Sequence, residues 1–514
     1  MENFRMIDNT KIFYTGKAIL IGLLVGLIVS VFRLIIEKLL FYVKSFYLFF
    51  AAEPLWLIPW GILSIIIALL IGFLIKKDPN ITGSGIPQVE GQLLGEIHCN
   101  WWSVLWKKFV GGILSIGSGL FLGREGPSIQ LGASIGQGIS EFFQGDKMEK
   151  KVLISSGASA GLAAAFNAPI AGLLFVLEEI HHNFSPLVLL TSLASAITAN
   201  FISLNFFGLK PVLYLGEVPP FPVKKYGLLI LLGIFLGFFG LLYSKVLLSL
   251  PKIYGKISFL PPYFYGIIPF LFIIPIGVFF PELLGGGSEI IFSLEKTSPT
   301  LMILTGLFIL RFIFSMISYG GNLPGGIFLP ILSLGAILGY IYGNMVIDIT
   351  KIDAIYIRSF VMFSMAGYFT AIGKAPLTAM ILVTEMVGSL NHLMPLAVVS
   401  FVSYIIVDLA GADPIYEALL ENMIEKKSKI LKGRSEIIEI PVGAESILDG
   451  KMIREINWPA EALITSIRRG SKQIIAHGDT VMHVGDCLIV LTDEGMVNQV
   501  RQQIKHMSKD YIRG

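Results

Sequence analysis

Residues 127–136 read Pro127-Ser-Ile-Gln-Leu-Gly-Ala-Ser-Ile-Gly136, and residues 330–339 read Pro330-Ile-Leu-Ser-Leu-Gly-Ala-Ile-Leu-Gly339. Both stretches follow the pattern P-x3-L-G-A-x2-G, 203 positions apart. A second match follows in the same order, because 168–178 and 375–385 share the pattern A-P-[IL]-x5-V-x-E, 207 positions apart. Two ordered matches with nearly equal offsets predict a duplicated body, with repeats at about 15–210 and 222–424.

The composition places this duplicated body in a membrane. The 514 residues are 54% hydrophobic and 15% charged, with a mean hydropathy of +0.75, whereas a soluble domain is about 25% charged. Charge concentrates at the end, where 14 basic and 12 acidic residues lie in 425–514. We therefore expect a membrane domain at 1–424, a basic linker at 425–436 and a small soluble domain at 437–508. The net charge of +3 gives no indication of a nucleic-acid partner, and two cysteines cannot build a disulfide framework.

Eleven apolar runs are long enough to be candidate membrane helices. They lie near 18–50, 55–75, 102–122, 152–177, 186–206, 226–250, 262–280, 299–318, 326–346, 355–386 and 392–410. The first 17 residues and the run that follows do not resemble a removable signal peptide. The sequence thus predicts a multi-pass protein of the cell membrane, with lipid around it.

Clusters of basic residues indicate which side faces the cytoplasm. They are Lys76 and Lys77; Lys147, Lys150 and Lys151; and Lys426, Lys427, Lys429, Lys432 and Arg434. By the positive-inside rule these segments face the cytoplasm, and so does the C-terminal domain.

Three segments rich in glycine and proline interrupt the apolar pattern. They read Gly83-Ser-Gly-Ile-Pro87, Gly123-Arg-Glu-Gly-Pro127 and Gly325-Gly-Ile-Phe-Leu-Pro330. Glycine permits a tight turn, and proline suits the first turn of a new helix. Because helix N-termini carry unpaired N–H groups and a partial positive charge, several of them aimed at one point bind an anion without a full positive charge. Interrupted helices at matching repeat positions are typical of secondary transporters, whose substrate site lies between the halves.

These motifs, together with Ala-Gly-Leu-Ala-Ala-Ala-Phe-Asn-Ala-Pro at 160–169, resemble the CLC family of chloride channels and proton-coupled chloride exchangers in order and spacing. The resemblance covers about 15–424. It implies a polytopic α-helical membrane protein with the CLC fold, which is two inverted repeats of tilted, broken helices. It also implies a homodimer with one anion pathway in each subunit.

The resemblance assigns chloride binding to four positions. Ser84 corresponds to the serine whose hydroxyl contacts the central chloride, and a serine there resembles the chloride-selective pattern. Tyr416 corresponds to the tyrosine opposite, although an interfacial aromatic is the alternative for that residue alone. The backbone amides around Ile327 and Phe328 supply further donors. The other motif residues that it implies for selectivity are Gly83, Gly85, Pro87, Gly123, Arg124, Gly126, Pro127, Gly325, Gly326 and Pro330.

Two glutamates are the candidates for gating and proton transfer. Burying an ionisable side chain at a helix break inside the membrane costs free energy, so such a residue usually has a function. We expect the carboxylate of Glu125 to occupy the anion site at a helix N-terminus and to leave it when protonated. The alternative is an ion pair between Glu125 and Arg124 that holds a turn. Glu179 corresponds to the internal proton-transfer glutamate of the family's exchangers, while for Glu178, which matches Glu385 in the repeat, we favour a structural role. For Lys108 the alternatives are electrostatic attraction of anions and a lysine that snorkels to the interface, and we favour the second.

The C-terminal domain shows short alternating runs that predict strands, at 437–440, 463–467, 473–476 and 487–491, followed by a helix over 497–506. Its pattern of glycines and charges resembles the TrkA-C domain, the C-terminal subdomain of RCK proteins. The resemblance implies a small α/β dimerising module in the cytosol that senses a small ligand, such as a cyclic dinucleotide or a nucleotide. A passive dimer clamp is the alternative.

The combined hypothesis is a chloride/proton antiporter whose glutamate gate competes with the anion. The alternative is a passive voltage- or pH-gated chloride channel on the same scaffold. A ligand sensor in which the TrkA-C-like domain controls the membrane part is a further hypothesis. An intramembrane enzyme using Glu125 as acid or base lacks any accompanying nucleophile or metal motif, so we expect no enzyme activity, no cofactor and no bound metal.

Overall fold

The computed structural model describes residues 9–181, 185–214, 216, 218–297, 299–428, 435–443, 446–470, 472–493 and 496–509. Residues 429–434 of the predicted basic linker, with Lys429, Lys432 and Arg434, lie outside this described part. The chain divides into two compact units. One comprises Met1–Glu90 and Cys99–Glu417, and the other comprises Gly91–His98 and Ala418–Gly514.

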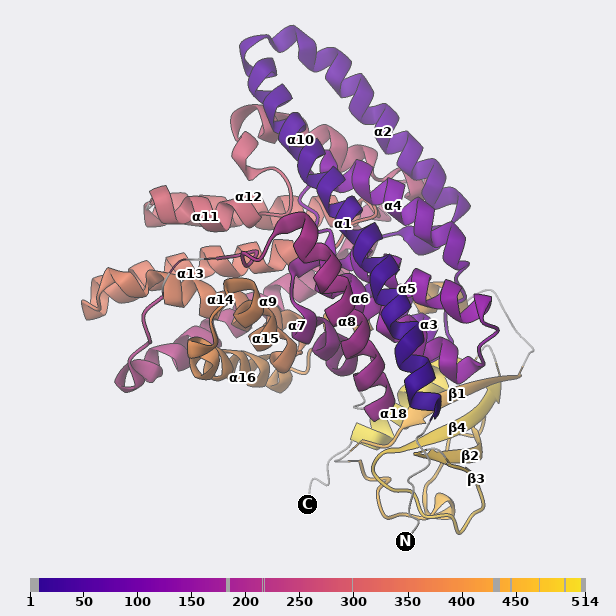
Figure 1. Cartoon of the computed structure of the whole chain (residues 1–514). Helices are drawn as coiled ribbons and strands as arrows, with labels where there is room; N and C mark the ends of the chain where they lie inside the picture. The colour runs from indigo at the N-terminus through magenta and orange to yellow at the C-terminus, as the bar shows by residue number, and fades with distance from the viewer. Residues whose placement is uncertain are drawn as a thin grey trace. The chain divides into compact units, whose positions relative to one another are not determined.

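The first unit is helical, and Figure 1 shows α1 and α2 running back from a shared turn as two long helices. The α-helices up to the end of α17 are α1 (Asn9–Ala52), α2 (Leu57–Lys77), α3 (Ile86–Leu94), α4 (Trp101–Gly117), α5 (Glu125–Phe142), α6 (Lys147–Phe166), α7 (Pro169–Phe175), α8 (Pro186–Phe207), α9 (Tyr226–Tyr254), α10 (Ile267–Phe279), α11 (Ser288–Thr297), α12 (Leu301–Gly320), α13 (Phe328–Thr350), α14 (Ile357–Gly373), α15 (Pro376–Val387), α16 (Leu393–Leu409) and α17 (Ile415–Ser428). A π-helical turn, Val176–Ile180, continues α7.

Within the described residues, nine helices are long and apolar enough to cross a membrane. This agrees with the predicted polytopic membrane body. Two of the predicted runs, 152–177 and 355–386, are each two helices. The first helix of each pair ends at a residue in the left-handed conformation, Asn167 with φ 55° and Lys374 with φ 58°. The next helix of each pair then begins on a proline.

Helix α5 was not among the predicted apolar runs, although it is buried along nearly its whole length. Its sequence is rich in Gly, Ser and Gln, so a hydropathy window does not detect it. The small residues have a packing role instead. A Cβ on Gly132 would collide with the carbonyl oxygen of Gly157 in α6, and one on Gly339 in α13 would lie 2.7 Å from the carbonyl oxygen of Phe360 in α14. The repeated P-x3-L-G-A-x2-G motif is therefore a close helix crossing, α5 on α6 and α13 on α14.

Reciprocal contacts relate the two repeats. Glu178 accepts hydrogen bonds from the backbone N–H groups of Leu377 (3.1 Å) and Thr378 (2.7 Å), at the start of α15. Glu385 accepts them from Ile170 (3.1 Å) and Ala171 (2.8 Å), at the start of α7. Each of these contacts maps onto its counterpart with the 207-residue offset of the sequence repeat. When residue i contacts the counterpart of j and j contacts the counterpart of i, the two halves are related by a two-fold axis. The predicted duplication is confirmed, and so is the structural role predicted for Glu178.

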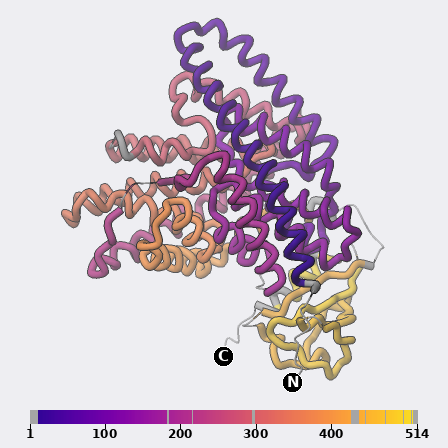
Figure 2. The backbone as a smooth tube through the Cα atoms, viewed as in Figure 1, coloured from indigo at the N-terminus to yellow at the C-terminus, as the bar shows by residue number. Residues whose placement is uncertain are grey.

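The second unit contains an antiparallel sheet in the order β1-β4-β2-β3. Its elements are β1 (Ser435–Pro441), β2 (Leu463–Arg469), β3 (Lys472–Ile475), β4 (Asp486–Asp493) and α18 (Val497–Lys509). Side chains of these elements form one apolar core, to which β1 contributes Ile438, β4 contributes Val490 and α18 contributes Ile504. The yellow part of the tube in Figure 2 follows this fold from β1 to α18. The predicted strands and final helix are confirmed.

Candidate anion and proton site

The first motif is a tight turn that leads into α3. Gly83 and Gly85 have φ values of 60° and 91°, which residues other than glycine rarely adopt. Between them Ser84 is 1% exposed, and its Oγ accepts a hydrogen bond from the backbone N–H of Ile86 at 3.3 Å. The turn thus fixes a buried hydroxyl at the beginning of a helix, and Pro87 follows in the first helical turn.

The three motifs, which lie far apart in the sequence, come together in space. The N–H of Gly325 donates to the carbonyl oxygen of Gly83 at 2.9 Å. Gly123 and Gly326 exchange two backbone hydrogen bonds of 2.7 Å, and they are 203 residues apart, like the repeats. A Cβ on Gly126 would lie 2.8 Å from the Cβ of Ser84. Glycine is required at these contacts because the backbones approach each other so closely.

Helices α5 and α13 begin at this junction, with Pro127 and Pro330 in their first turns. The residues that precede them, Arg124 and Ile327, make no side-chain capping hydrogen bond within the described structure. The first N–H groups of both helices are thus available, together with the positive ends of the helix dipoles. Partial positive charge is therefore concentrated where α5 and α13 begin, and such a place favours an anion.

Glu125 is the first residue of α5, and its side chain is completely buried. No side chain of the described residues donates a hydrogen bond to either carboxylate oxygen, and the backbone N–H groups of Glu125 itself and of Leu329 are the donors that face it. A Cβ on Gly123 would collide with Oε2 of Glu125 and would lie 3.2 Å from the backbone N of Leu329 in α13. The carboxylate therefore lies beside Gly123 at the start of α13. Arg124 approaches it only to 4.0 Å, from Nε to Oε1, so the two do not form a tight ion pair.

Aromatic side chains surround the first turn of α13. Phe328 is fully buried, and its ring centroid lies 4.4 Å from that of Phe369 and 6.1 Å from that of Phe175. Phe175 in turn lies 6.3 Å from Tyr416, whose buried hydroxyl has no hydrogen-bond partner in the described part of the chain. An unsatisfied buried hydroxyl is costly unless a ligand pairs with it.

Sequence reasoning missed Tyr319. Its hydroxyl oxygen would lie 3.3 Å from a Cβ on Gly83, so the phenol stands against the turn that carries Ser84. The available signal was its position near the end of α12, directly before the Gly320-Gly321 pair. A polar aromatic residue that precedes a glycine break in an apolar helix is a reasonable candidate for such a site.

Glu179 lies in the π-helical turn after α7 and is 3% exposed. Its Oε1 has no hydrogen-bond partner among the described residues. Both carboxylate oxygens would lie 3.8 Å from a Cβ on Gly373, at the end of α14. Neighbouring Glu178 instead caps α15, so the π-helical turn sends two consecutive carboxylates to different places.

The interpretation of Lys108 as a snorkelling residue was wrong. The side chain is completely buried, and its Nζ donates to the carbonyl oxygens of Ile81 (2.9 Å) and Gly83 (2.8 Å). The turn before Ser84 has carbonyl groups that no helix satisfies, and the lysine satisfies them. A lysine in an apolar run is usually explained by snorkelling. The sequence does not show that the carbonyl groups of Ile81 and Gly83 lie beside this one.

Comparisons with known proteins identify relatives for both units. The family described as voltage gated chloride channel matches residues 67–408, and the TrkA-C domain matches residues 437–505. The H(+)/Cl(-) exchange transporter ClcA of Vibrio vulnificus strain YJ016 is 32% identical over 440 residues, which cover 83% of this chain and 93% of the relative. The ClcA protein of Vibrio cholerae O395 is 32% identical over 438 residues, with the same shares covered. The crystal structure of a slow cyanobacterial Cl-/H+ antiporter superimposes with a TM-score of 0.76 at 30% identity, and covers 80% of this chain and 98% of that one.

Proposed function

This chain belongs to the voltage-gated chloride channel (CLC) family, and we propose that it is a chloride/proton antiporter in which Glu125 is both the gate and a proton carrier. The observation that carries the proposal is the fully buried Glu125 carboxylate, which lies at the joined starts of α5 and α13 and faces the backbone N–H groups of Glu125 and Leu329 with no side-chain donor among the described residues. The carboxylate of Glu125 thus occupies a position that is suited to bind an anion. The similar proteins named as exchange transporters support coupled exchange over a passive channel. A transport function also replaces the enzyme alternative.

The mechanism follows from competition between two anions for one place. Ionised Glu125 is held by the N–H groups and dipoles at the helix starts, and it blocks chloride. Protonation removes its charge, so the attraction is lost and the side chain leaves. Chloride then enters the vacated position. Because the carboxylate returns only after chloride has left and the proton has been released, anion and proton movements alternate.

The chloride site in this proposal is formed by the hydroxyls of Ser84 and Tyr416 with the backbone amides around Ile327 and Phe328. The buried hydroxyl of Ser84 at a helix start and the unpartnered hydroxyl of Tyr416 support these roles. These donors replace part of the hydration shell without a full positive charge, so binding stays weak enough for release. The remaining glycines, prolines and Arg124 of the three motifs shape the loops; they are Gly83, Gly85, Pro87, Gly123, Gly126, Pro127, Gly325, Gly326 and Pro330.

Glu179 passes protons between Glu125 and the cytoplasm. Its burial and its separation from the cap formed by Glu178 support this role, because a buried carboxylate whose Oε1 has no hydrogen-bond partner among the described residues is expensive to keep. Proton and chloride thus leave the centre by different routes.

The chain is organised as a transport domain (1–424), a basic linker (425–436) and a TrkA-C-like domain (437–508). Two copies form a homodimer, and the TrkA-C-like domain of each copy lies in the cytoplasm. The basic clusters beside the membrane helices support this orientation. The match to the TrkA-C domain supports a dimerising module that binds a small regulatory ligand, such as a cyclic dinucleotide or nucleotide.

The test is proton movement into liposomes that contain the purified full chain, driven only by a chloride gradient. We expect uphill proton movement. Glu125→Ala should abolish proton movement while chloride flux persists, and Glu179→Gln should reduce proton movement far more than chloride flux. Glu282→Gln, which neutralises an exposed carboxylate, is the matched control and should change neither flux. Chloride flux without any proton movement in the unaltered chain would identify a channel instead.

A further inference from the structure

We propose that Glu37, on α1, is a positioning residue for the gate: it holds the guanidinium of Arg124 away from Glu125 and so sets how readily the gate carboxylate takes up a proton. This inference rests on the proposed role of Glu125. It concerns a residue outside the three motifs, on a helix from which Arg33 also joins the charge network.

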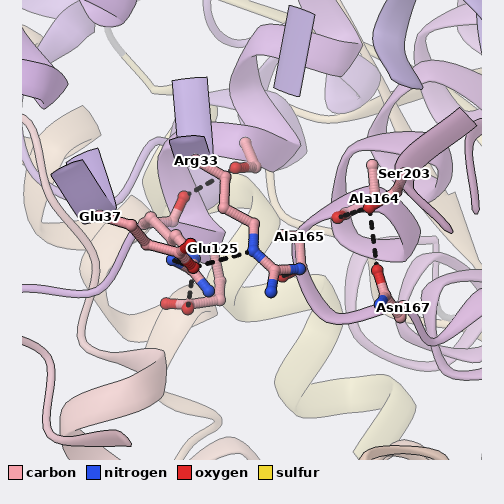
Figure 3. A network of polar contacts seen from close by, with 9 residues as sticks. Arg33, Glu37, Glu125, Ala164, Ala165, Asn167 and Ser203 are labelled. Atoms are coloured by element: carbon pink, nitrogen blue, oxygen red, sulfur yellow. Dashed lines mark hydrogen bonds and ion pairs between the residues drawn. The ribbon is translucent and has the colours of Figure 1, made fainter. Parts of the chain in front are cut away.

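Glu37 is the centre of a small charge network. Its Oε1 accepts a hydrogen bond of 2.6 Å from the Nη1 of Arg124 and one of 3.0 Å from the Nε of Arg33, one turn earlier on α1. In Figure 3 the side chains of Arg33 and Glu37 lie close to Glu125. One carboxylate therefore binds two guanidinium groups, one of which belongs to the residue directly before the gate.

Arg33 is fixed by further contacts, so it can hold Glu37 in place. Its Nη1 lies 3.4 Å from the carbonyl oxygen of Ala165, at the end of α6, and its guanidinium carbon lies 3.7 Å from the ring centroid of Phe207. Cation–π contact and burial limit the movement of this side chain. Beside it, Ser203 donates to the carbonyl oxygen of Ala164 at 2.9 Å and so braces the same end of α6 (Figure 3).

Arg124 is divided between two carboxylates. Its Nη1 is bound to Glu37, while its Nε has no hydrogen-bond partner in the described structure and lies 4.0 Å from Oε1 of Glu125. A guanidinium can bind a carboxylate with two parallel hydrogen bonds when nothing restrains it. Glu37 provides this restraint. While Glu37 is ionised, it keeps Arg124 close to the gate carboxylate but too far away for a tight ion pair.

Glu37, unlike the gate, lies at the surface of the chain. Its side chain is 44% exposed, and it lines a surface hollow of about 460 Å³ together with Leu34, Lys38, Phe41, Tyr42 and Phe207. Substitution there is therefore unlike substitution in a packed core, and the carboxylate can be neutralised without opening a cavity.

The other charged groups on neighbouring elements do not substitute for Glu37. Helices α8 and α10 carry none. The described ion pairs on the other elements are Lys44 with Glu289, Lys107 with Asp78, Lys17 with Glu149 and Lys150 with Glu141, and Lys108 donates to backbone carbonyl groups. The other charged residues of these elements are Lys11 and Lys38 on α1, Lys147 and Lys151 on α6, and Glu282 in the turn Pro281–Leu283. None of the described pairs involves Arg124. Apart from the neighbouring Arg33 and the gate itself, Glu37 is the charged group that the described structure places in contact with Arg124.

The experiment measures chloride flux against pH, equal on both sides of liposomes containing the full chain. Glu37→Gln removes a negative charge near the gate and also releases Arg124, and both effects stabilise ionised Glu125. We expect the pH midpoint of acid-activated flux to fall by about one unit, a tenfold change in the proton concentration required. Glu37→Met removes the same charge with an apolar side chain and should shift the midpoint in the same direction. Glu37→Asp keeps the charge and should largely restore it.

Two controls separate this inference from its alternatives. Glu289→Gln breaks another ion pair on α1, that with Lys44, and should leave the midpoint unchanged. Glu37→Gln combined with Glu125→Ala should show no shift relative to Glu125→Ala alone, because the gate carboxylate is absent. An unshifted midpoint in Glu37→Gln and Glu37→Met, in protein that still couples chloride to protons, would overturn the inference and leave the antiporter intact. A shift that persists without Glu125 would also overturn it.

Discussion

Glu178 and Glu179 are consecutive, yet the structure gives them different surroundings, and the different tasks that we propose for them can be tested by replacing each alone. Glu178 accepts three hydrogen bonds at the start of α15: from the N–H of Leu377, and from both the N–H and the hydroxyl of Thr378. Its counterpart Glu385 accepts two, both from N–H groups at the start of α7. The additional bond to Glu178 comes from the hydroxyl of Thr378.

The magnitude follows from counting these bonds. A hydrogen bond to a carboxylate at a partly exposed helix start is assigned about 1 kcal/mol, the typical net value for a protein hydrogen bond and below the range for fully buried charged groups. Glu178→Ala should therefore destabilise the fold by about 3 kcal/mol and Glu385→Ala by about 2 kcal/mol. Thr378→Val should remove about 1 kcal/mol and nothing else. We expect a fall in Tm on the order of 5 °C for Glu178→Ala, and less for the other two.

The assay is thermal unfolding of the purified full chain in detergent, combined with proton and chloride fluxes of the folded fraction in liposomes. The expected order of Tm loss is Glu178→Ala, Glu385→Ala, Thr378→Val, while proton movement persists in all three. Glu179→Gln should reverse the result: lost proton movement with no loss of Tm, because it removes no hydrogen bond of a helix cap. If Glu178→Ala kept its Tm and lost proton coupling, the division of tasks argued here would be wrong.

Two further predictions concern one helix crossing and the C-terminal unit. Gly132→Ala places a Cβ against the carbonyl oxygen of Gly157 and should separate α5 from α6, at a cost of about 2 kcal/mol that size-exclusion chromatography and Tm detect; an unchanged Tm would refute the close-crossing argument. Asp486 is buried, which alone would raise its pKa, but hydrogen bonds from Arg469 (2.8 Å) and the N–H of His483 (2.8 Å) lower the pKa below its ordinary value. Its stabilising effect is therefore complete at neutral pH and is lost as the pH falls through the lowered pKa, below about 3.8. In denaturant-dependent amide exchange of the full chain, Asp486→Asn should open β4 more easily at pH 7 by about 1 kcal/mol, and should differ little from the unaltered chain near pH 2.

The sequence predicted the elements whose signals are local. Strands and the last helix of the C-terminal unit followed from alternation and turn residues, and the duplicated body followed from two short matches. Helix α5 escaped detection because its burial depends on glycine contacts with α6, and such contacts add no hydropathy. Asn167 and Lys374 end helices in a left-handed conformation that only the following proline hinted at. Residues whose partner lies far along the chain were the least predictable. The role of Lys108, for example, is visible only when the position of the Gly83 carbonyl group is known.

The same principle explains why the buried cations of the membrane unit need not hold an anion tightly at the proposed chloride site. Lys108 is saturated by two backbone carbonyl groups, and Arg124 is held by Glu37. Arg311, also fully buried, donates to the carbonyl oxygens of Leu283 and Gly285 at 3.0 Å. Lys108 and Arg311 are thus turned toward backbone oxygen atoms, whereas Arg124 is shared between Glu37 and the gate, with its Nε 4.0 Å from Oε1 of Glu125. Since a free cation at the junction of α5 and α13 would retain an anion and hold the gate carboxylate ionised, releasing Arg124 should disturb the proposed cycle while the residues of the proposed chloride site stay unchanged.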